Sequence, residues 1–104
     1  MAVAFVQEFA IDPDGDRSTT NYDAIQERLD TRNNPPDGGL FHSAGFDEEA
    51  GVFRIFDVWE TREHAQRFID ERVMPIVNEV TAGRPDAGPP RRAYFYELHD
   101  LQMR

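Results

Sequence analysis

The sequence predicts a single α+β domain in which two helices cover one face of a four-stranded antiparallel sheet. Its 104 residues are enough for one domain, so we treat residues 1–104 as one unit. Four runs rich in β-branched and aromatic residues alternate with two amphipathic stretches, in the order strand, helix, strand, strand, helix, strand. Two of these runs are apolar on both faces, which predicts that both faces of the sheet are covered.

The first half of the chain supplies a strand, a loop and a helix. Residues 2–9 are predicted as the strand, and the acidic run 12–18 as a turn-rich loop. A helix is expected from Thr20, whose side chain can cap it, to about residue 31. Residues 32–39 contain two prolines and form a second loop. The apolar stripe of the helix consists of Tyr22, Ile25 and Leu29.

A β-hairpin is predicted next. Residues 40–46 and 52–59 are its strands, and the polar run 47–51 is its turn, with Gly51 supplying a positive φ. Alternation along the second strand puts Phe53, Ile55, Asp57 and Trp59 on one face and Arg54, Phe56 and Val58 on the other.

The second helix is predicted to begin after Thr61, whose side chain can cap it. Pro75 lacks a backbone donor and disfavours helical geometry at the residue before it, so we expect a kink or a break there. Residues 83–90 form a loop, and residues 92–98 form the last strand. The buried stripe of this helix consists of Ala65, Phe68, Ile69, Val73, Ile76, Val77 and Val80.

This order of elements is the split βαβ pattern of the ferredoxin-like fold. Two helices cover only one face of a four-stranded sheet, and the other face still carries Phe56 and Val58. Each such side chain costs roughly 1.5–3 kcal/mol if it stays in water, and a large exposed apolar patch indicates a partner. We therefore expect a symmetric homodimer that associates through this sheet face.

Composition excludes several classes of function. The formal net charge is −9, which disfavours binding to nucleic acid or to an anionic membrane surface. All 11 basic residues are arginine, so lysine Schiff-base chemistry is excluded. The absence of cysteine excludes thiol catalysis, disulfides and cysteine-ligated zinc. No signal peptide or membrane-spanning apolar stretch is present, so we expect an acidic cytoplasmic protein.

Residues 57–77, DVWETREHAQRFIDERVMPIV, resemble the dimeric α/β-barrel superfamily, in particular its antibiotic-biosynthesis-monooxygenase-like branch. In that branch a strand ends in Trp-Glu-(Ser/Thr) and a helix follows at once, as at Trp59-Glu60-Thr61. The resemblance implies a dimeric barrel. It also implies a cofactor-free monooxygenase, isomerase or dehydratase that acts on a small hydrophobic or aromatic metabolite. The alternative is a non-catalytic module that binds a small molecule or has a structural role.

The functional residues of characterised relatives are matched only in part. Of the three residues that the quinone-forming monooxygenases use, Trp59 is present, while Ile55 and Ala65 occupy the other two positions. The haem-degrading branch has Trp and His where this chain has Phe68 and Asn78, so haem degradation is not expected.

Two residues are candidates for acid–base chemistry. Asp57 shares a strand face with Trp59, and a carboxylate that faces the helix-covered interior is costly unless it is paired or protonated. It is therefore a candidate general base, although a structural bond to a backbone amide or an arginine would also explain it. His64, in the first turn of the second helix, is a candidate acid or base, or an exposed helix-start residue.

The same interior would hold the ligand. The predicted substrate-binding residues are Trp59, His42, Gln7, Tyr96 and Phe68. Structural roles stay open for them: Trp59 would also serve as a plug, and His42 as a satisfied core histidine. Alternation requires one of Gln7 and Glu8 to face the helices. Arg54, on the opposite face, is expected to pair with Glu8 or Glu97 across the dimer.

No metal or cofactor is expected. The acidic run 12–16 departs from the spacing of a calcium-binding loop. The three histidines lack metal-ligand spacing.

Overall fold

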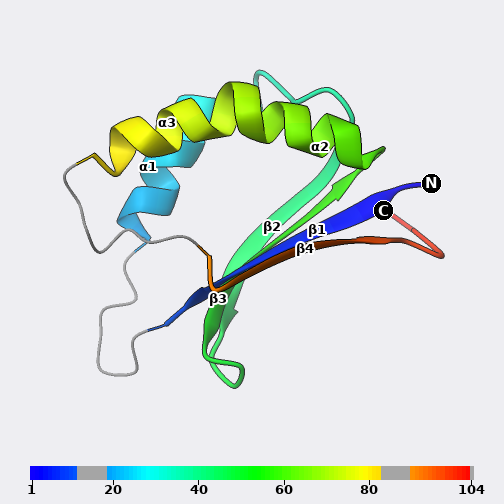
Figure 1. Cartoon of the computed structure of the whole chain (residues 1–104), viewed down its shortest axis with the longest axis horizontal. Coiled ribbons are helices and arrows are strands. Elements are labelled where there is room, and N and C mark those ends of the chain that lie inside the picture. Colours follow the sequence, from blue (N-terminus) through cyan, green and yellow to red (C-terminus); the bar gives the residue numbers. More distant parts are fainter. Residues whose placement is uncertain (12–18, 83–89, 104) are drawn as a thin grey trace.

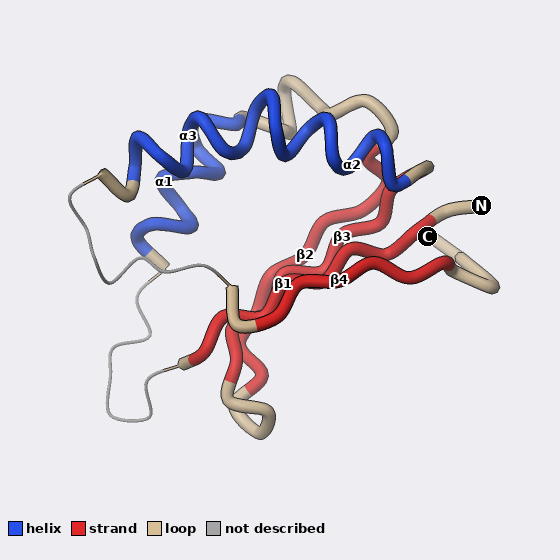
Figure 2. Tube along the Cα trace, viewed as in Figure 1, coloured by secondary structure: helices blue, strands red, loops and turns tan. Residues whose placement is uncertain are grey.

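The computed structural model describes residues 1–11, 19–82 and 90–103, and it has the predicted ferredoxin-like architecture. The strands form one antiparallel sheet in the order β2-β3-β1-β4, with the helices layered on one face of it (Figure 1). Figure 2 shows the helical layer and the sheet as two separate layers. The elements are β1 (Val3–Ala10), α1 (Thr20–Leu29), β2 (Gly39–Asp47), β3 (Val52–Trp59), α2 (Arg62–Phe68), a π-helical turn η1 (Ile69–Val73), α3 (Met74–Val80) and β4 (Arg92–Glu97).

The register of β1 decides which side chains face the helices. β1 pairs with β3 on one side and β4 on the other, with Phe5 opposite Asp57 and Phe95. Because side chains alternate along a strand, this row and the neighbouring row that contains Val3 and Trp59 share one face. The main core forms between this face and α2. It consists of Val3, Phe5, Trp59 and Ala65, with Phe68, Ile69 and Phe95 packed against them.

The opposite face of the sheet is partly covered by its own side chains. Val58, which we expected to be exposed in a single chain, is 1% exposed. The apolar surface that remains in contact with water is contributed instead by Phe41 and Tyr96, which are 48% and 45% exposed. An apolar patch therefore exists on this face, but different side chains form most of it.

The second helical segment is not broken at Pro75. Met74, directly before the proline, keeps helical angles of φ −61° and ψ −40°. Its N–H bonds to the carbonyl of Ile69, five residues back, which is the π-helical pattern of η1. The wider turn places a change of hydrogen-bonding pattern next to the residue that lacks a donor. Of the predicted kink or break, the break is not found: the helical segment is continuous, and its irregularity is the π-helical turn directly before Met74.

The helix starts differ from each other in their capping. Thr61 caps α2 as predicted, since its hydroxyl oxygen accepts the His64 backbone N–H at 3.1 Å. Thr20 does not cap α1: it is the first helical residue, and Thr19 precedes it with its hydroxyl 2.7 Å from the Asp23 carboxylate. None of the helices in the described ranges is long and apolar enough to cross a membrane.

Gly38, before β2, has the most restrictive surroundings of the glycines that the structure describes. Its φ is +77°, and a Cβ there would lie 2.4 Å from the His64 ring, so Gly38→Ala combines backbone strain with a clash. Gly51→Ala, at φ +72° with free space around it, should lose only the backbone term of about 1–2 kcal/mol. We expect Gly38→Ala to lower the free energy of unfolding by about 1–3 kcal/mol more than Gly51→Ala.

Denaturant titration measures these changes. Gly45→Ala is the control, because Gly45 is the one described glycine that has both open space for a Cβ and no positive φ. Equal losses for Gly38→Ala and Gly51→Ala would show that the His64 contact imposes no constraint.

Candidate functional site

Three polar side chains from three elements meet on the helix-facing side of the sheet. Tyr22 lies on α1, His42 on β2, and Asp57 lies directly opposite His42 on β3. The Tyr22 hydroxyl is 2.5 Å from His42 Nε2, and His42 Nδ1 is 2.5 Å from Asp57 Oδ1. The three groups form one continuous hydrogen-bonded chain, which we call the Tyr–His–Asp relay.

The donors and acceptors of the relay follow from what each group can carry. An ionised carboxylate only accepts, so His42 Nδ1 carries the hydrogen that bonds to Asp57. In a neutral imidazole the other nitrogen is then an acceptor, and it receives the Tyr22 hydroxyl hydrogen. His42 is thus oriented by Asp57 and has its basic nitrogen directed at Tyr22, the arrangement in which a histidine serves as a general base.

Electrostatics keep the Tyr22 phenol protonated near neutral pH. Burial raises the pKa of Tyr22 above its ordinary value of 10.0, and the negative charges of Asp57 and Asp23 raise this pKa further. A tyrosinate at this position would be poorly solvated and close to a carboxylate. Tyr22 can therefore pass a proton to His42 only when its oxygen receives another proton at the same time.

The relay is reachable from solvent. The His42 side chain is 40% exposed and the Asp57 side chain 15% exposed. On the same face of the sheet Ala44 and Ala93 are exposed, so the helices do not close over this part of the sheet. Aromatic rings stand beside it: Phe53 makes an edge contact with Tyr22 at a centroid distance of 5.4 Å. The surroundings suit a small, partly apolar ligand.

The structure brings together some of the predicted site residues. Asp57 and His42 are joined in the relay. Gln7 faces the helices from the neighbouring row, opposite Ile55, while Glu8 faces the other way. Trp59 is buried in the core, 5.3 Å from the Phe68 ring between centroids. Trp59 Nε1 is buried and has no hydrogen-bond partner in the described part of the chain.

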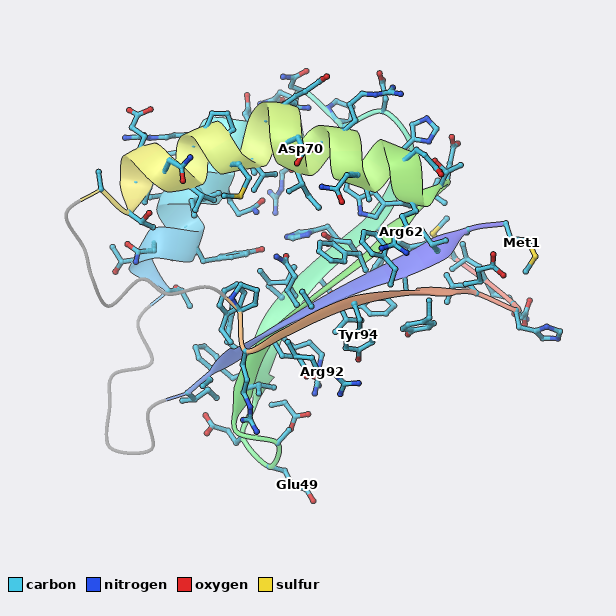
Figure 3. The ribbon with its side chains drawn as sticks, viewed as in Figure 1. Met1, Glu49, Arg62, Asp70, Arg92 and Tyr94 are labelled. Atoms are coloured by element: carbon cyan, nitrogen blue, oxygen red, sulfur yellow. The ribbon has the colours of Figure 1, made fainter. Side chains whose placement is uncertain are left out.

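Two predicted residues lie elsewhere. His64 is at the start of α2, where its Nδ1 bonds to the Thr61 hydroxyl at 2.7 Å, and it takes no part in the relay. Tyr96 pairs with Ala4 and therefore lies on the sheet face that points away from the helices. Figure 3 shows Tyr94, two residues earlier on that strand, on the same side.

The part that Tyr22 plays in the relay was not predicted. The sequence places Tyr22 in the apolar stripe of α1, which indicates only that it faces the sheet. A usable signal existed: it is the only residue of that three-member stripe with a polar group, and the stripe faces the same layer as Asp57. The missing information was the position of α1 along the sheet, which no local pattern specifies.

Arg54 forms ion pairs within its own chain and not with Glu97. Its guanidinium is 2.8 Å from Glu8 and 2.8 Å from Asp47. The Arg54 hydrogen bond, followed by the Ala50 backbone N–H, lowers the pKa of Asp47. These contacts hold the hairpin end of the sheet. The acidic run 12–16, which was weighed as a calcium loop, lies outside the described residues.

The fold and the relay together define a small α+β protein with a candidate acid–base site, and solved structures show what it is similar to. SnoaB, a cofactor-independent oxygenase from Streptomyces nogalater, superposes with a TM-score of 0.62 at 12% identity, over 96% of this chain and 95% of its own. A Nitrosomonas europaea protein assigned as an antibiotic biosynthesis monooxygenase gives 0.66 at 13% identity, over 94% and 90%. A dimeric protein of unknown function with a ferredoxin-like fold, from Bacteroides fragilis, gives 0.62 at 9%, over 93% and 96%.

These identities show a shared fold. The resemblance noted in residues 57–77 is therefore confirmed as a likeness of fold to antibiotic-biosynthesis-monooxygenase-like structures. No protein-family model matches the sequence, and no curated protein matches it. A shared fold does not fix a reaction, so the function has to be argued from the site.

The raised pKa of Tyr22 leads to a titration experiment. We expect Tyr22 to ionise above its ordinary pKa of 10.0, measured as the tyrosinate absorbance that is lost in Tyr22→Phe. Because the folded protein holds this proton more tightly than the unfolded chain, the Tyr22 contribution to stability is complete below pH 10.0 and is lost as pH rises further.

Asp57→Asn should lower the pKa of Tyr22 more than Asp23→Asn does, because Asp57 is the stronger of the two electrostatic causes. An equal effect of both substitutions would place Tyr22 away from Asp57 in solution.

Proposed function

We propose that the Tyr–His–Asp relay is the acid–base site of a cofactor-free enzyme that removes a proton from a small aromatic or hydrophobic substrate. The observation that supports this most directly is the uninterrupted hydrogen bonding from the Tyr22 hydroxyl to His42 and Asp57. A neutral tyrosine backed by an oriented histidine is suited to taking a proton from a hydroxyl group or an activated C–H.

The proton transfer conserves charge within the site. The substrate gives its proton to the Tyr22 oxygen while Tyr22 gives its own proton to His42 Nε2. His42 becomes an imidazolium that keeps its Nδ1–H bond to Asp57, and the substrate is left as an anion. The new positive charge on His42 lies beside the carboxylate, so it is stabilised as it forms.

The anion has two outcomes. It takes the proton back at another atom, which is an isomerisation, or it reacts with dioxygen. In the second case a CH₂ group and O₂ give a C=O group and one water, with no external electron donor. SnoaB, which shares the fold, is described as a cofactor-independent oxygenase, and this favours the second outcome.

We also propose that the chain acts as a homodimer through the sheet face opposite the helices. Phe41 and Tyr96 leave apolar surface in water there, and the T-shaped contact of Phe41 with Phe56 continues that surface across β3. The structurally similar Bacteroides fragilis protein is described as dimeric. Association through this face would leave the relay, on the other face, open to ligand.

A non-catalytic binding module is the competing function. In that case the His42–Asp57 pair would serve only as a structural contact between β2 and β3, and the aromatic side chains would only hold a ligand. The two functions make different predictions. An enzyme turns its ligand over and loses that turnover, but not ligand binding, when the His42 base is removed, whereas a binding module shows binding and no turnover.

Turnover tests the enzymatic proposal. We expect the protein, freed of metals with a chelator, to catalyse deuterium exchange or oxygen uptake with members of a panel of anthrones, naphthols and related hydroxyaromatics. His42→Gln and Asp57→Asn should each lower the rate constant by at least about 100-fold, the usual contribution of a general base. Exposed His99 lies near the end of β4, and His99→Gln is the matched control.

Full turnover by His42→Gln would remove the relay from the mechanism. Binding of panel members without any turnover by the unaltered protein would establish the binding module instead.

Sedimentation tests the dimer. Phe41→Asp places a charge in the proposed interface and should raise the dimer dissociation constant by about 100-fold, because the charge would be buried without a partner. Met74→Asp makes the same change at a 41% exposed position on α3 and should leave the dimer intact. A monomeric unaltered protein at micromolar concentration would contradict the proposed assembly.

A further inference from the structure

A pocket lies away from the relay, between α2–η1 and the loop that precedes β2. It has a volume of about 180 Å³, close to that of six waters in the liquid, and His64, Arg67, Phe68 and Arg72 line its helical side. Pro36 and Asp37 are among the residues on its loop side. None of the relay residues lines it.

His64 is held in this pocket by two independent contacts. Its ring packs against Gly38, where even a Cβ would be only 2.4 Å away. The Thr61 hydroxyl accepts the His64 backbone N–H at 3.1 Å, so its own hydrogen is available to donate to His64 Nδ1 at 2.7 Å. This arrangement puts the ring hydrogen of a neutral His64 on Nε2, as a donor that is not used by Thr61.

The two arginines line the pocket without forming an ion pair to any carboxylate of the described ranges, although Asp37 and Glu71 line it as well. Arg72 donates to the backbone carbonyls of Leu29 and Asn34 at 3.0 and 3.1 Å and lies 4.9 Å above the Phe68 ring. The Arg67 side chain has no ion pair or hydrogen bond with any residue of the described ranges. Neither arginine has a carboxylate partner among the described residues, and both line the pocket together with the oriented His64 imidazole.

We infer that this pocket binds a small organic monocarboxylate, whose carboxylate is held by Arg67, Arg72 and His64 and whose apolar body lies against Phe68 and Pro36. Arginine binds carboxylates through paired N–H donors, and the ring and proline provide the apolar contact. Asp37 and Glu71, which also line the pocket, repel a second negative charge and so favour monoanions over dianions. The site does not depend on the chemistry proposed for the relay.

Ligand binding to the full chain tests the inference, with benzoate as the probe and benzamide as its uncharged counterpart. In ¹⁵N-labelled protein at constant ionic strength, we expect millimolar benzoate to shift the amide signals of His64, Arg67 and Phe68 in a saturable way. Benzamide should not do so.

Arg67→Gln should weaken benzoate binding by about tenfold, the usual effect of losing one charged hydrogen-bond partner. The matched control is Arg62→Gln, which removes the same charge from the same helix at a residue that stacks on Phe95, outside the pocket. Figure 3 shows Arg62 between the helix and the sheet. His64→Phe keeps a ring against Gly38 but removes the donor, and it should also weaken binding.

Any one of several results would overturn the inference. These are the absence of saturable benzoate shifts, equal shifts with benzamide, and unchanged affinity in Arg67→Gln. Benzoate shifts centred on Tyr22 and His42 would assign the carboxylate to the relay and would equally reject this pocket as its site.

Discussion

The antiparallel register at Asp57 is the constraint on which the rest of the structure depends. Asp57 lies between His42 on β2 and Phe5 on β1, so one row of the sheet carries a polar pair beside an apolar core. A slip of one residue would turn Asp57 and Trp59 to the other face together. The apolar packing of Trp59 and Phe5 under α2 therefore also fixes the orientation of the acid–base pair.

The third relay member depends on a different set of contacts. α1 packs mainly on η1 and α3. Arg72 holds the carboxyl end of α1 by donating to the backbone carbonyl of Leu29, and Arg28 pairs with Glu79 at 2.9 Å. The Tyr22 hydrogen bond is thus a link between the helical layer and the sheet. The π-helical turn that contains Arg72 contributes to the position of Tyr22 without touching the relay.

Sequence patterns were sufficient for the fold because alternation and capping are local. The two faces of β3 and the Thr61 cap follow from residues adjacent in the chain. Tyr96 was expected to line the ligand site under the helices, but it lies on the other face of the sheet. Its face is set by the pairing of β4 with β1, which are far apart in the sequence, so no local pattern specifies it. Pro75 was expected to kink or break the helix because a donor is missing, and the structure instead has a π-helical turn beside it in a continuous segment. Tyr22 and His42 meet only through tertiary packing.

The electrostatics of the relay limit which of its members can hold the transferred proton. Tyr22 is disfavoured as an anion by burial and by Asp57, so a deprotonated tyrosine is not the resting base. Asp57 already accepts the Nδ1 hydrogen of His42. In the proposed reaction the remaining acceptor is His42 Nε2, and its protonation would pair an imidazolium with the Asp57 carboxylate beside the substrate anion. The same negative charge that keeps Tyr22 neutral is thus what makes His42 a competent base, because it stabilises the imidazolium and not the tyrosinate.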